Sequence, residues 1–153
     1  MIVDERSKRR AEALISEGVV RFELQHMGRG PEDARTYLLD DMVIVRLRGV
    51  LTPAEKQLAQ KGIGEASAEE RGRTLVKQMR TELIERASDI LEGIILSVLG
   101  RTVRSMHTDI STVTGERVIV FILGEEAREP SDAQQAQPAG ARPARQTNQT
   151  RRD

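Results

Sequence analysis

Cysteine and tryptophan are absent from this 153-residue chain, and Phe22, Tyr37 and Phe121 are its only aromatic residues. Without cysteine the chain forms no disulfide, has no thiol nucleophile and offers no thiolate ligand to zinc. Three scattered aromatic rings provide no platform on which bases or sugars could stack. The core must therefore consist of Leu, Ile, Val and Met side chains.

The sequence also lacks a charge imbalance and a long apolar run. Lys plus Arg and Asp plus Glu both total 24, so the formal net charge is zero, unlike the basic domain of a dedicated nucleic-acid binder. No apolar run follows the basic residues 6–10, as a signal peptide requires, and no stretch approaches the roughly 18 apolar residues of a membrane span. We therefore expect a cytoplasmic protein with no nucleic-acid partner and no membrane span of its own.

The first predicted element is an amphipathic helix over residues 4–27. The run Gly28-Arg29-Gly30-Pro31 ends it, because glycine adopts the left-handed cap conformation and proline cannot continue a helix. One broad apolar stripe recurs at spacings of four and three residues and contains Ala11, Ile15, Gly18 and Phe22, with Leu14 and Val19 beside them. Glu23 and most other charged residues of the helix are predicted to lie away from this stripe.

Residues 34–40 and 42–48 are predicted to form a hairpin that bends at residues 40–41. With that bend, one face of the hairpin carries a good core surface, made of Ala34, Thr36, Leu38, Val43, Val45 and Leu47. The other face pairs Arg35 with Arg46, and like charges directly opposite each other are unfavourable in a sheet. We expect this second face to meet solvent, acidic groups, an anion or another subunit.

Thr52-Pro53-Ala54-Glu55 carries several agreeing signals for the start of a helix. Thr52 suits the N-cap, Pro53 suits the first helical position, and Glu55 is placed to complete a capping box. This helix is expected to be short and to stop near residues 61–62.

The longest predicted helix covers residues 68–99, after a second capping box made by Ser67 and Glu70. Gly93 lies inside it and costs about 1 kcal/mol relative to alanine, which indicates close approach of another backbone. Its expected buried stripe consists of Leu75, Met79, Leu83, Ala87, Ile90, Ile94 and Val98, and it is widened by Val76, Leu91, Ile95 and Leu99.

Residues 101–123 are predicted to form a second hairpin, bent at Thr114-Gly115. Strand alternation then places one set of side chains toward the core: Met106, Thr108, Ile110, Ile119, Phe121 and Leu123. The opposite face carries Val103, Ser105, His107, Asp109, Ser111, Val118, Val120 and Ile122.

His107 and Asp109 are therefore neighbours on one face of a strand. A carboxylate that orients an imidazole is part of a general base or of a metal site. A metal site needs at least three ligands, and the other histidine, His26, is on the first helix. The serines beside the pair lie in a strand and not on a strained turn. A structural or interface role for His107 and Asp109 is favoured over direct chemistry.

Taken together, these patterns predict a two-layer α+β domain over residues 1–124, with the order α-β-β-α-α-β-β and a mainly antiparallel sheet covered by helices. Residues 125–153 contain almost no large apolar side chains and are predicted to be disordered. Both hairpins keep apolar side chains on their second faces, which leads us to expect a homodimer: Tyr37, Ile44, Val118, Val120 and Ile122.

Three segments, in this order, resemble the MpsC-like family of small bacterial proteins: Gly28-Arg29-Gly30-Pro31, residues 45–56, and residues 107–111 with residues 114–121. The resemblance covers about residues 7–123. It implies a cytosolic protein associated with an ion-translocating system that generates membrane potential, and it brings no known active site. Among the matching positions, Arg46, His107 and Asp109 have no explanation in turns or helix caps.

We therefore expect a non-enzymatic accessory or interaction module without a cofactor or metal. Its partner would be a membrane protein complex that translocates an ion or inorganic carbon. The alternative is a small-ligand or anion-binding domain, with a weak hydrolase as its least favoured form, that uses Arg35, Arg46, His107 and Asp109. This alternative requires the two hairpins to bring those side chains within about 3 Å of one ligand atom.

Overall fold

Local signals in the sequence set the ends of the first helix. A computed structural model describes residues 4–60 and 66–127 of the chain, and in it α1 runs over Glu5–Met27. The N-cap residue is Asp4, whose Oδ1 accepts a hydrogen bond from the Ser7 amide at 2.7 Å. Gly28 closes the helix with a φ of 79°, in the left-handed region. The predicted helix and its glycine cap are confirmed.

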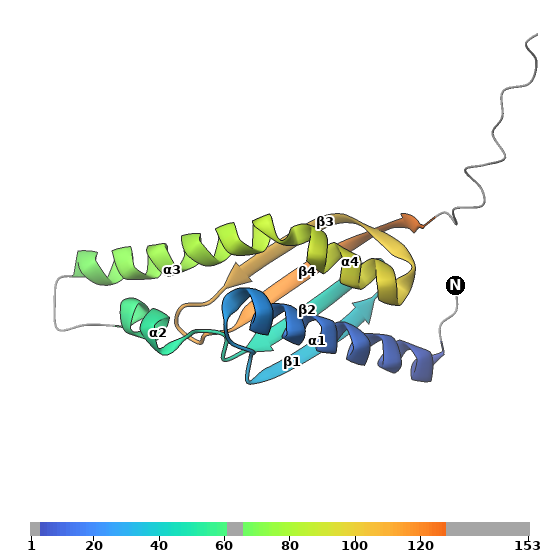
Figure 1. The fold of residues 1–153 in the computed structure, drawn as a ribbon, viewed down its shortest axis with the longest axis horizontal. Helices are drawn as coiled ribbons and strands as arrows, with labels where there is room; N and C mark the ends of the chain where they lie inside the picture. The colour runs from blue at the N-terminus through green and yellow to red at the C-terminus, as the bar shows by residue number, and fades with distance from the viewer. Residues whose placement is uncertain (1–3, 61–65, 128–153) are drawn as a thin grey trace, which may run out of the picture.

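The remaining elements follow the predicted order, with two helices, α3 and α4, in place of the one predicted over residues 68–99, and they give the predicted α+β class (Figure 1). They are β1 (Asp33–Leu39), β2 (Met42–Arg48), α2 (Pro53–Ala59), α3 (Ala66–Arg86), α4 (Ser88–Leu99), β3 (Arg101–Ile110) and β4 (Arg117–Glu126). The strands form one antiparallel sheet in the order β1-β2-β4-β3. The last strand extends two residues past the predicted domain limit at residue 124, and residues 128–153 of the predicted tail lie outside the described residues.

The first hairpin has the predicted register. Leu39 pairs with Met42, and Arg35 pairs with Arg46. The bend is tight because Asp40 adopts a φ of 53°, which aspartate tolerates better than most residues. The face of this hairpin that carries Val43, Val45 and Leu47 is buried, as predicted.

The second hairpin differs from the prediction at its turn. The connection is the loop 111–116, and not a bend of two residues at Thr114-Gly115, so Ile110 pairs with Arg117. The Ser111 amide donates to the Glu116 carbonyl, and the Gly115 amide donates to the Ser111 carbonyl, each at 2.8 Å. Relative to the predicted bend, the pairing of β3 with β4 is shifted by two residues, which is an even number. The faces predicted for His107 and Asp109 are therefore unchanged.

A second correction concerns Val103. The register of β3 shifts between Val103 and Ser105, so that Val103 pairs with Leu123 and packs against the core. The prediction had placed Val103 with Ser105 on the opposite face. An irregularity of this kind reverses the alternation of side chains, and nothing in the local pattern marks it.

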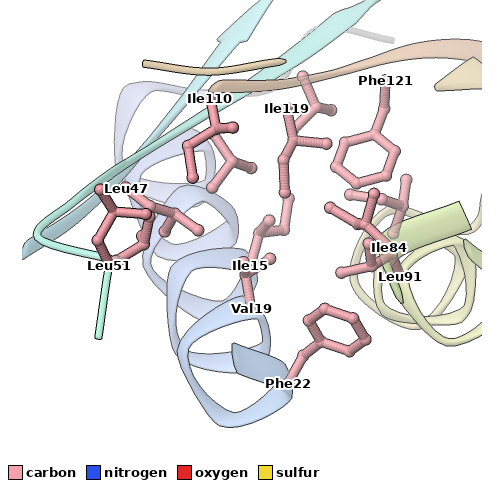
Figure 2. Close-up of a cluster of buried hydrophobic side chains, with 14 of the residues drawn as sticks. Ile15, Val19, Phe22, Leu47, Leu51, Ile84, Leu91, Ile110, Ile119 and Phe121 are labelled. Atoms are coloured by element: carbon pink, nitrogen blue, oxygen red, sulfur yellow. The ribbon is translucent and has the colours of Figure 1, made fainter. Parts of the chain in front are cut away.

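The core lies between one face of the sheet and the helices. Figures 1 and 2 show α1 and α4 on that face, with their apolar side chains pointing to those of β2 and β4. The largest contributors are buried completely or nearly so: Ile15, Val19, Phe22, Val43, Val45, Leu47, Leu91, Ile95, Ile119 and Phe121. The opposite face of the sheet meets no helix in the described part of the chain.

The predicted helix 68–99 is two helices. α3 ends at Arg86, and α4 begins after Ala87, whose φ of −105° and ψ of 13° break the helical path. There is no glycine or proline at this position, so the break has no local signal. α3 also begins at Ala66, which excludes Ser67 as its N-cap. α2 ends at Ala59, before residues 61–62, and it is a separate helix from α3.

The buried stripe of α3 is one residue away from the predicted one. Leu75, Met79 and Leu83 are 57%, 44% and 39% exposed. The buried residues at the same spacing are Val76, Arg80 and Ile84. Val76 was among the residues predicted to be buried, and Arg80 and Ile84 were not. Because the middle residue of the buried stripe is an arginine, the apolar pattern favoured the neighbouring stripe. Ile90 in α4 is also exposed, contrary to the prediction.

Glycine marks close helix contacts at other positions than expected. Apart from its chain neighbours and the backbone of its own helix, no atom of the described residues lies within 4 Å of where a Cβ of Gly93 would be, so the predicted close approach there is wrong. A Cβ on Gly18 would lie 2.8 Å from Cγ2 of Ile94, where α1 crosses α4. A Cβ on Gly72 would collide with the carbonyl oxygen of Leu58, so α3 approaches α2 closely only because residue 72 is glycine.

These contacts predict opposite effects for two glycine-to-alanine substitutions. Gly72→Ala should lower the free energy of unfolding by about 1–3 kcal/mol, because backbone atoms of α2 must move. Gly93→Ala should raise it by up to about 1 kcal/mol, because alanine favours a helix and fits without a clash. Urea unfolding of both variants measures the difference. Equal effects of the two substitutions would contradict the α2–α3 contact.

Candidate functional site

The four residues predicted as a ligand site lie on the face of the sheet that the helices leave uncovered. Strand pairing arranges this face in rows. Arg35, Arg46, Val118 and Asp109 form one row across β1, β2, β4 and β3. Tyr37, Ile44, Val120 and His107 form the next. Leu39, Met42, Ile122 and Ser105 form the third. We call this surface the open sheet face.

The predicted site residues share this face but do not converge on one point. Arg35 and Asp109 are on the two edge strands, and three strand spacings separate them by about 14 Å. Arg46 donates from Nε to Glu116 Oε2 at 2.9 Å, and this bond raises the pKa of Arg46. A single small ligand could not contact all of these groups at hydrogen-bond distance. The geometry therefore adds no support to the anion-binding alternative.

His107 and Asp109 contact other residues and not each other. Nε2 of His107 lies 3.2 Å from Oγ of Ser105. Asp109 accepts a hydrogen bond from the Ile110 amide at 2.9 Å, which lowers the pKa of this carboxyl group, and Lys77 Nζ lies 3.3 Å from it. No cluster of three or more His, Asp or Glu side chains in residues 4–60 and 66–127 is arranged to hold a metal ion.

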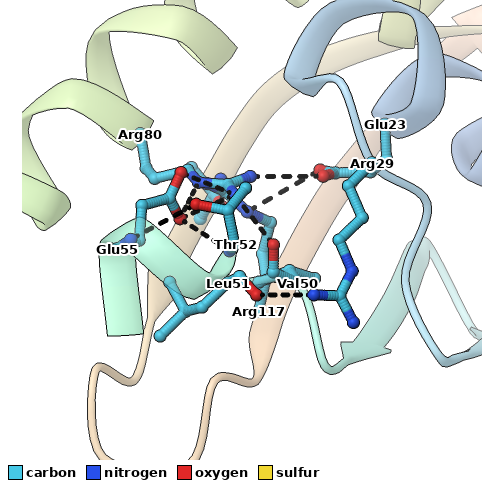
Figure 3. Close-up of polar contacts among 9 residues, drawn as sticks. Glu23, Arg29, Val50, Leu51, Thr52, Glu55, Arg80 and Arg117 are labelled. Atoms are coloured by element: carbon cyan, nitrogen blue, oxygen red, sulfur yellow. Dashed lines mark hydrogen bonds and ion pairs between the residues drawn. The ribbon is translucent and has the colours of Figure 1, made fainter. Parts of the chain in front are cut away.

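A second polar site, which the sequence analysis missed, is buried beneath the helices. Two carboxylates and two guanidinium groups meet where α1, α2, α3 and β4 come together (Figure 3). We call it the buried ion cluster, and it consists of Glu23, Glu55, Arg80 and Arg117. Glu23 was predicted to lie away from the apolar stripe of the first helix, and Glu55 was predicted only to cap its own helix. Both carboxylates are in the interior.

Arg80 is the centre of the cluster. Its Nε and Nη2 donate to the Glu55 carboxylate at 2.8–3.1 Å, and Nη2 also donates to the Val50 carbonyl at 2.8 Å. Nη1 lies 3.5 Å from Oε2 of Glu23. Arg80 thus connects α3 to α2, to α1 and to the segment that follows β2. Arginine suits this place because its planar group can bind several acceptors at once.

The predicted capping box is what positions Glu55. The Glu55 amide donates to Thr52 Oγ1 at 3.3 Å, and the Thr52 amide donates to Glu55 Oε2 at 3.4 Å. The same carboxylate faces Arg80. A local capping interaction therefore becomes part of a tertiary one. Arg29, from the Gly-Arg-Gly-Pro run, donates to the nearby Leu51 carbonyl at 3.1 Å and holds the same segment.

Arg117 completes the cluster less well. Its Nη1 donates to Thr108 Oγ1 at 3.2 Å, and its Nε lies 3.9 Å from Glu23 Oε1, beyond hydrogen-bond distance. In the described part of the chain, Glu23 Oε1 and Arg117 Nε and Nη2 have no hydrogen-bond partner. Burial raises the pKa of Glu23 and lowers that of Arg117. This half of the cluster is therefore held by charge attraction more than by hydrogen bonds.

One sequence signal could have revealed the cluster. Arg80 lies four residues from both Val76 and Ile84, and Glu23 lies four residues after Val19, so both charged side chains are on buried stripes. A charge at the spacing of a buried stripe requires a partner of opposite charge. The partner itself cannot be identified from spacing, because it is on another element.

A third feature is an apolar surface of α3. Leu75, Met79 and Leu83 follow one another at four-residue spacing on the side of the helix that faces away from the core. We call these three residues the α3 stripe. Figure 1 shows that the N-terminal part of α3 extends past the end of the sheet, beside α2. Exposed apolar residues that form a stripe of this kind are typical of a surface that binds another protein.

The fold and these sites define a small two-layer α+β domain in which helices cover one side of the sheet and the other side is the open sheet face. Residues 7–125 match the family described as "Na+-translocating membrane potential-generating system (MpsC)", and the chain belongs to this family. It is 42% identical over 118 residues to "Uncharacterized protein YbcI" of Bacillus subtilis (strain 168). The aligned residues cover 77% of this chain and 89% of that protein. The predicted family resemblance is confirmed.

No solved structure matches the chain. Among the helices that the structure describes, none has both the length and the apolar composition needed to cross a membrane.

The buried ion cluster predicts a large effect for Arg80→Met. This substitution leaves Glu55 and Glu23 buried without their main partner, so the free energy of unfolding should fall by about 3–5 kcal/mol. The matched control is Arg86→Met on the same helix, because Arg86 makes only an exposed pair with Glu82. The control should change stability by less than about 1 kcal/mol. Urea unfolding measures both, and similar values for the two variants would show that the cluster does not hold α3.

Proposed function

We propose that this chain is a cytoplasmic, non-enzymatic accessory module of a Na+-translocating membrane system. In this proposal it binds a protein component of that system through the α3 stripe. The exposure of Leu75, Met79 and Leu83 is the observation that carries the proposal. The family description supplies the class of partner, because it refers to a membrane system that generates a potential.

The shape of the α3 stripe supports this role. Three large apolar side chains in a line suit a groove or a second helix on the partner, which would contact the side chains at positions i, i+4 and i+8. Charged and polar residues surround the line, as they do at the rim of protein interfaces: Arg71, Gln78, Glu82 and Arg86. All four are exposed.

The opposite side of α3 supports the role in a second way. Arg80 and Ile84 are buried there, so the helix is held against the domain by both ion pairs and apolar contacts. A helix that is already ordered loses little conformational entropy on binding. The stripe can therefore bind a partner without a prior folding step.

The test is a substitution in the stripe that leaves the fold intact. Met79→Glu places a charge in the middle of the stripe and should abolish association with the membrane fraction, because a buried carboxylate without a partner is costly. Thr81→Glu adds the same charge at an exposed position of α3 that belongs neither to the stripe nor to its rim, and it should have no effect. In cells whose own copy is deleted, the Thr81→Glu protein should restore Na+-dependent membrane potential, and the Met79→Glu protein should not.

Two results would contradict the proposal. One is a deletion strain whose membrane potential in Na+ medium equals that of its parent. The other is a folded Met79→Glu protein that restores the potential and cofractionates with membranes as well as the wild type does. Circular dichroism and urea unfolding of the purified variants show whether each one is folded.

A further inference from the structure

We propose that the open sheet face binds the same face of a second copy of this chain, with a two-fold axis that runs parallel to the strands. The proposal uses a different surface from the α3 stripe and does not depend on the proposed function. Four observations lead to it: the apolar centre of the face, the charged groups at its edges, its size, and the complementarity between its rows and the same rows of a second copy.

The centre of the open sheet face is apolar. Ile44 and Met42 on β2 lie beside Val120 and Ile122 on β4, and all four are only half-buried although they belong to central strands. Tyr37 and Leu39 on β1 are more exposed still. A sheet with helices on one side commonly has polar residues on the other. An apolar row on the uncovered side indicates that another surface covers it.

The edges of the face carry complementary groups. β1 carries Arg35 and Tyr37, and β3 carries Asp109 and His107 in the same two rows. A two-fold axis parallel to the strands exchanges the two edges and keeps each row opposite itself. It therefore places Arg35 over Asp109 of the second copy, and Tyr37 over His107 of the second copy. In the same arrangement Ile44 lies over Val120.

The other in-plane axis gives a worse match. An axis perpendicular to the strands reverses the order of the rows. Arg35 would then lie over Leu39 of the second copy, and it would lose water without gaining a carboxylate from that copy. The chemistry of the rows therefore selects the parallel axis. Facing sheets usually stack with their strands within about 30° of alignment, which this axis allows.

The size of the face is sufficient for a dimer. Four strands about 4.8 Å apart and seven to ten residues long cover a flat area of about 500 Å² on each copy. Two copies would bury about 1,000 Å² or more, which reaches the lower end of specific interfaces. The C-terminal segment 128–153 is an unsuitable occupant, because its sequence contains no Leu, Ile, Val, Met or aromatic residue to match the apolar rows.

The first test is the oligomeric state of two matched variants. Val120→Glu places a charge at the centre of the face and should weaken dimerisation by at least about a hundredfold, since each copy buries one unpaired carboxylate. Val113→Glu makes the same change at a position that is 86% exposed in the loop 111–116, and it should leave the dimer unchanged. Sedimentation over a range of concentrations measures both, and circular dichroism checks folding.

The second test determines the geometry and does not require a destabilising substitution. The chain contains no cysteine, so single cysteines can be introduced as Tyr37→Cys and His107→Cys. In the proposed dimer the two different positions are about 10 Å apart, and the two copies of residue 37 are about 17 Å apart. A short bismaleimide should therefore cross-link an equal mixture of the two variants, and it should cross-link neither variant alone.

Four outcomes would overturn the proposal. The wild-type chain could remain a monomer at high concentration. A folded Val120→Glu variant could dimerise as strongly as Val113→Glu. Tyr37→Cys alone could cross-link as efficiently as the mixture, which would place β1 over β1 and require the other axis. If Met79→Glu, and not Val120→Glu, removed the dimer, the second copy would bind the α3 stripe, and the sheet-face dimer would be wrong.

Discussion

The contacts of Arg80 are the constraint on which the rest of the structure depends. One guanidinium joins Glu55 of α2, Glu23 of α1 and the Val50 carbonyl after β2, so it connects elements that are far apart in the sequence. Buried ion pairs add little net stability compared with a well-packed apolar replacement, but a broken pair is strongly destabilising. We therefore expect the cluster to act mainly by destabilising arrangements of α3 in which Arg80 would lack these partners. Together with the buried Val76 and Ile84, it favours the observed side of the helix facing inward.

The orientation of α3 has a direct consequence for the surface. Because Val76, Arg80 and Ile84 face inward, Leu75, Met79 and Leu83 face outward. The open sheet face arises separately, since α1 and α4 cover only the other side of the sheet. The domain thus has two apolar surfaces on different elements. Our proposals assign one of them to a second copy of the chain and the other to a membrane system.

Much of the fold could be predicted because its signals involve neighbouring residues. The Gly28 terminus and the Thr52–Glu55 capping box each depend on contacts within about four positions. The faces of both hairpins follow from strand alternation, which survived even the wrong loop length in the second hairpin. The same alternation brought His107 and Asp109 to the face that carries Arg35 and Arg46. It could not show that their contacts would be to Ser105 and Lys77.

By itself, the sequence determined the order of the elements, most of their ends and the side of the sheet on which the polar residues lie. Tertiary structure decided the rotation of α3, the break at Ala87, the shift at Val103 and the composition of the buried ion cluster. The physical reason is the range of the interactions. Arg80 binds partners 25 and 57 positions away. Local periodicity counts apolar residues along one helix, and it cannot place a buried charge whose partner is on another element.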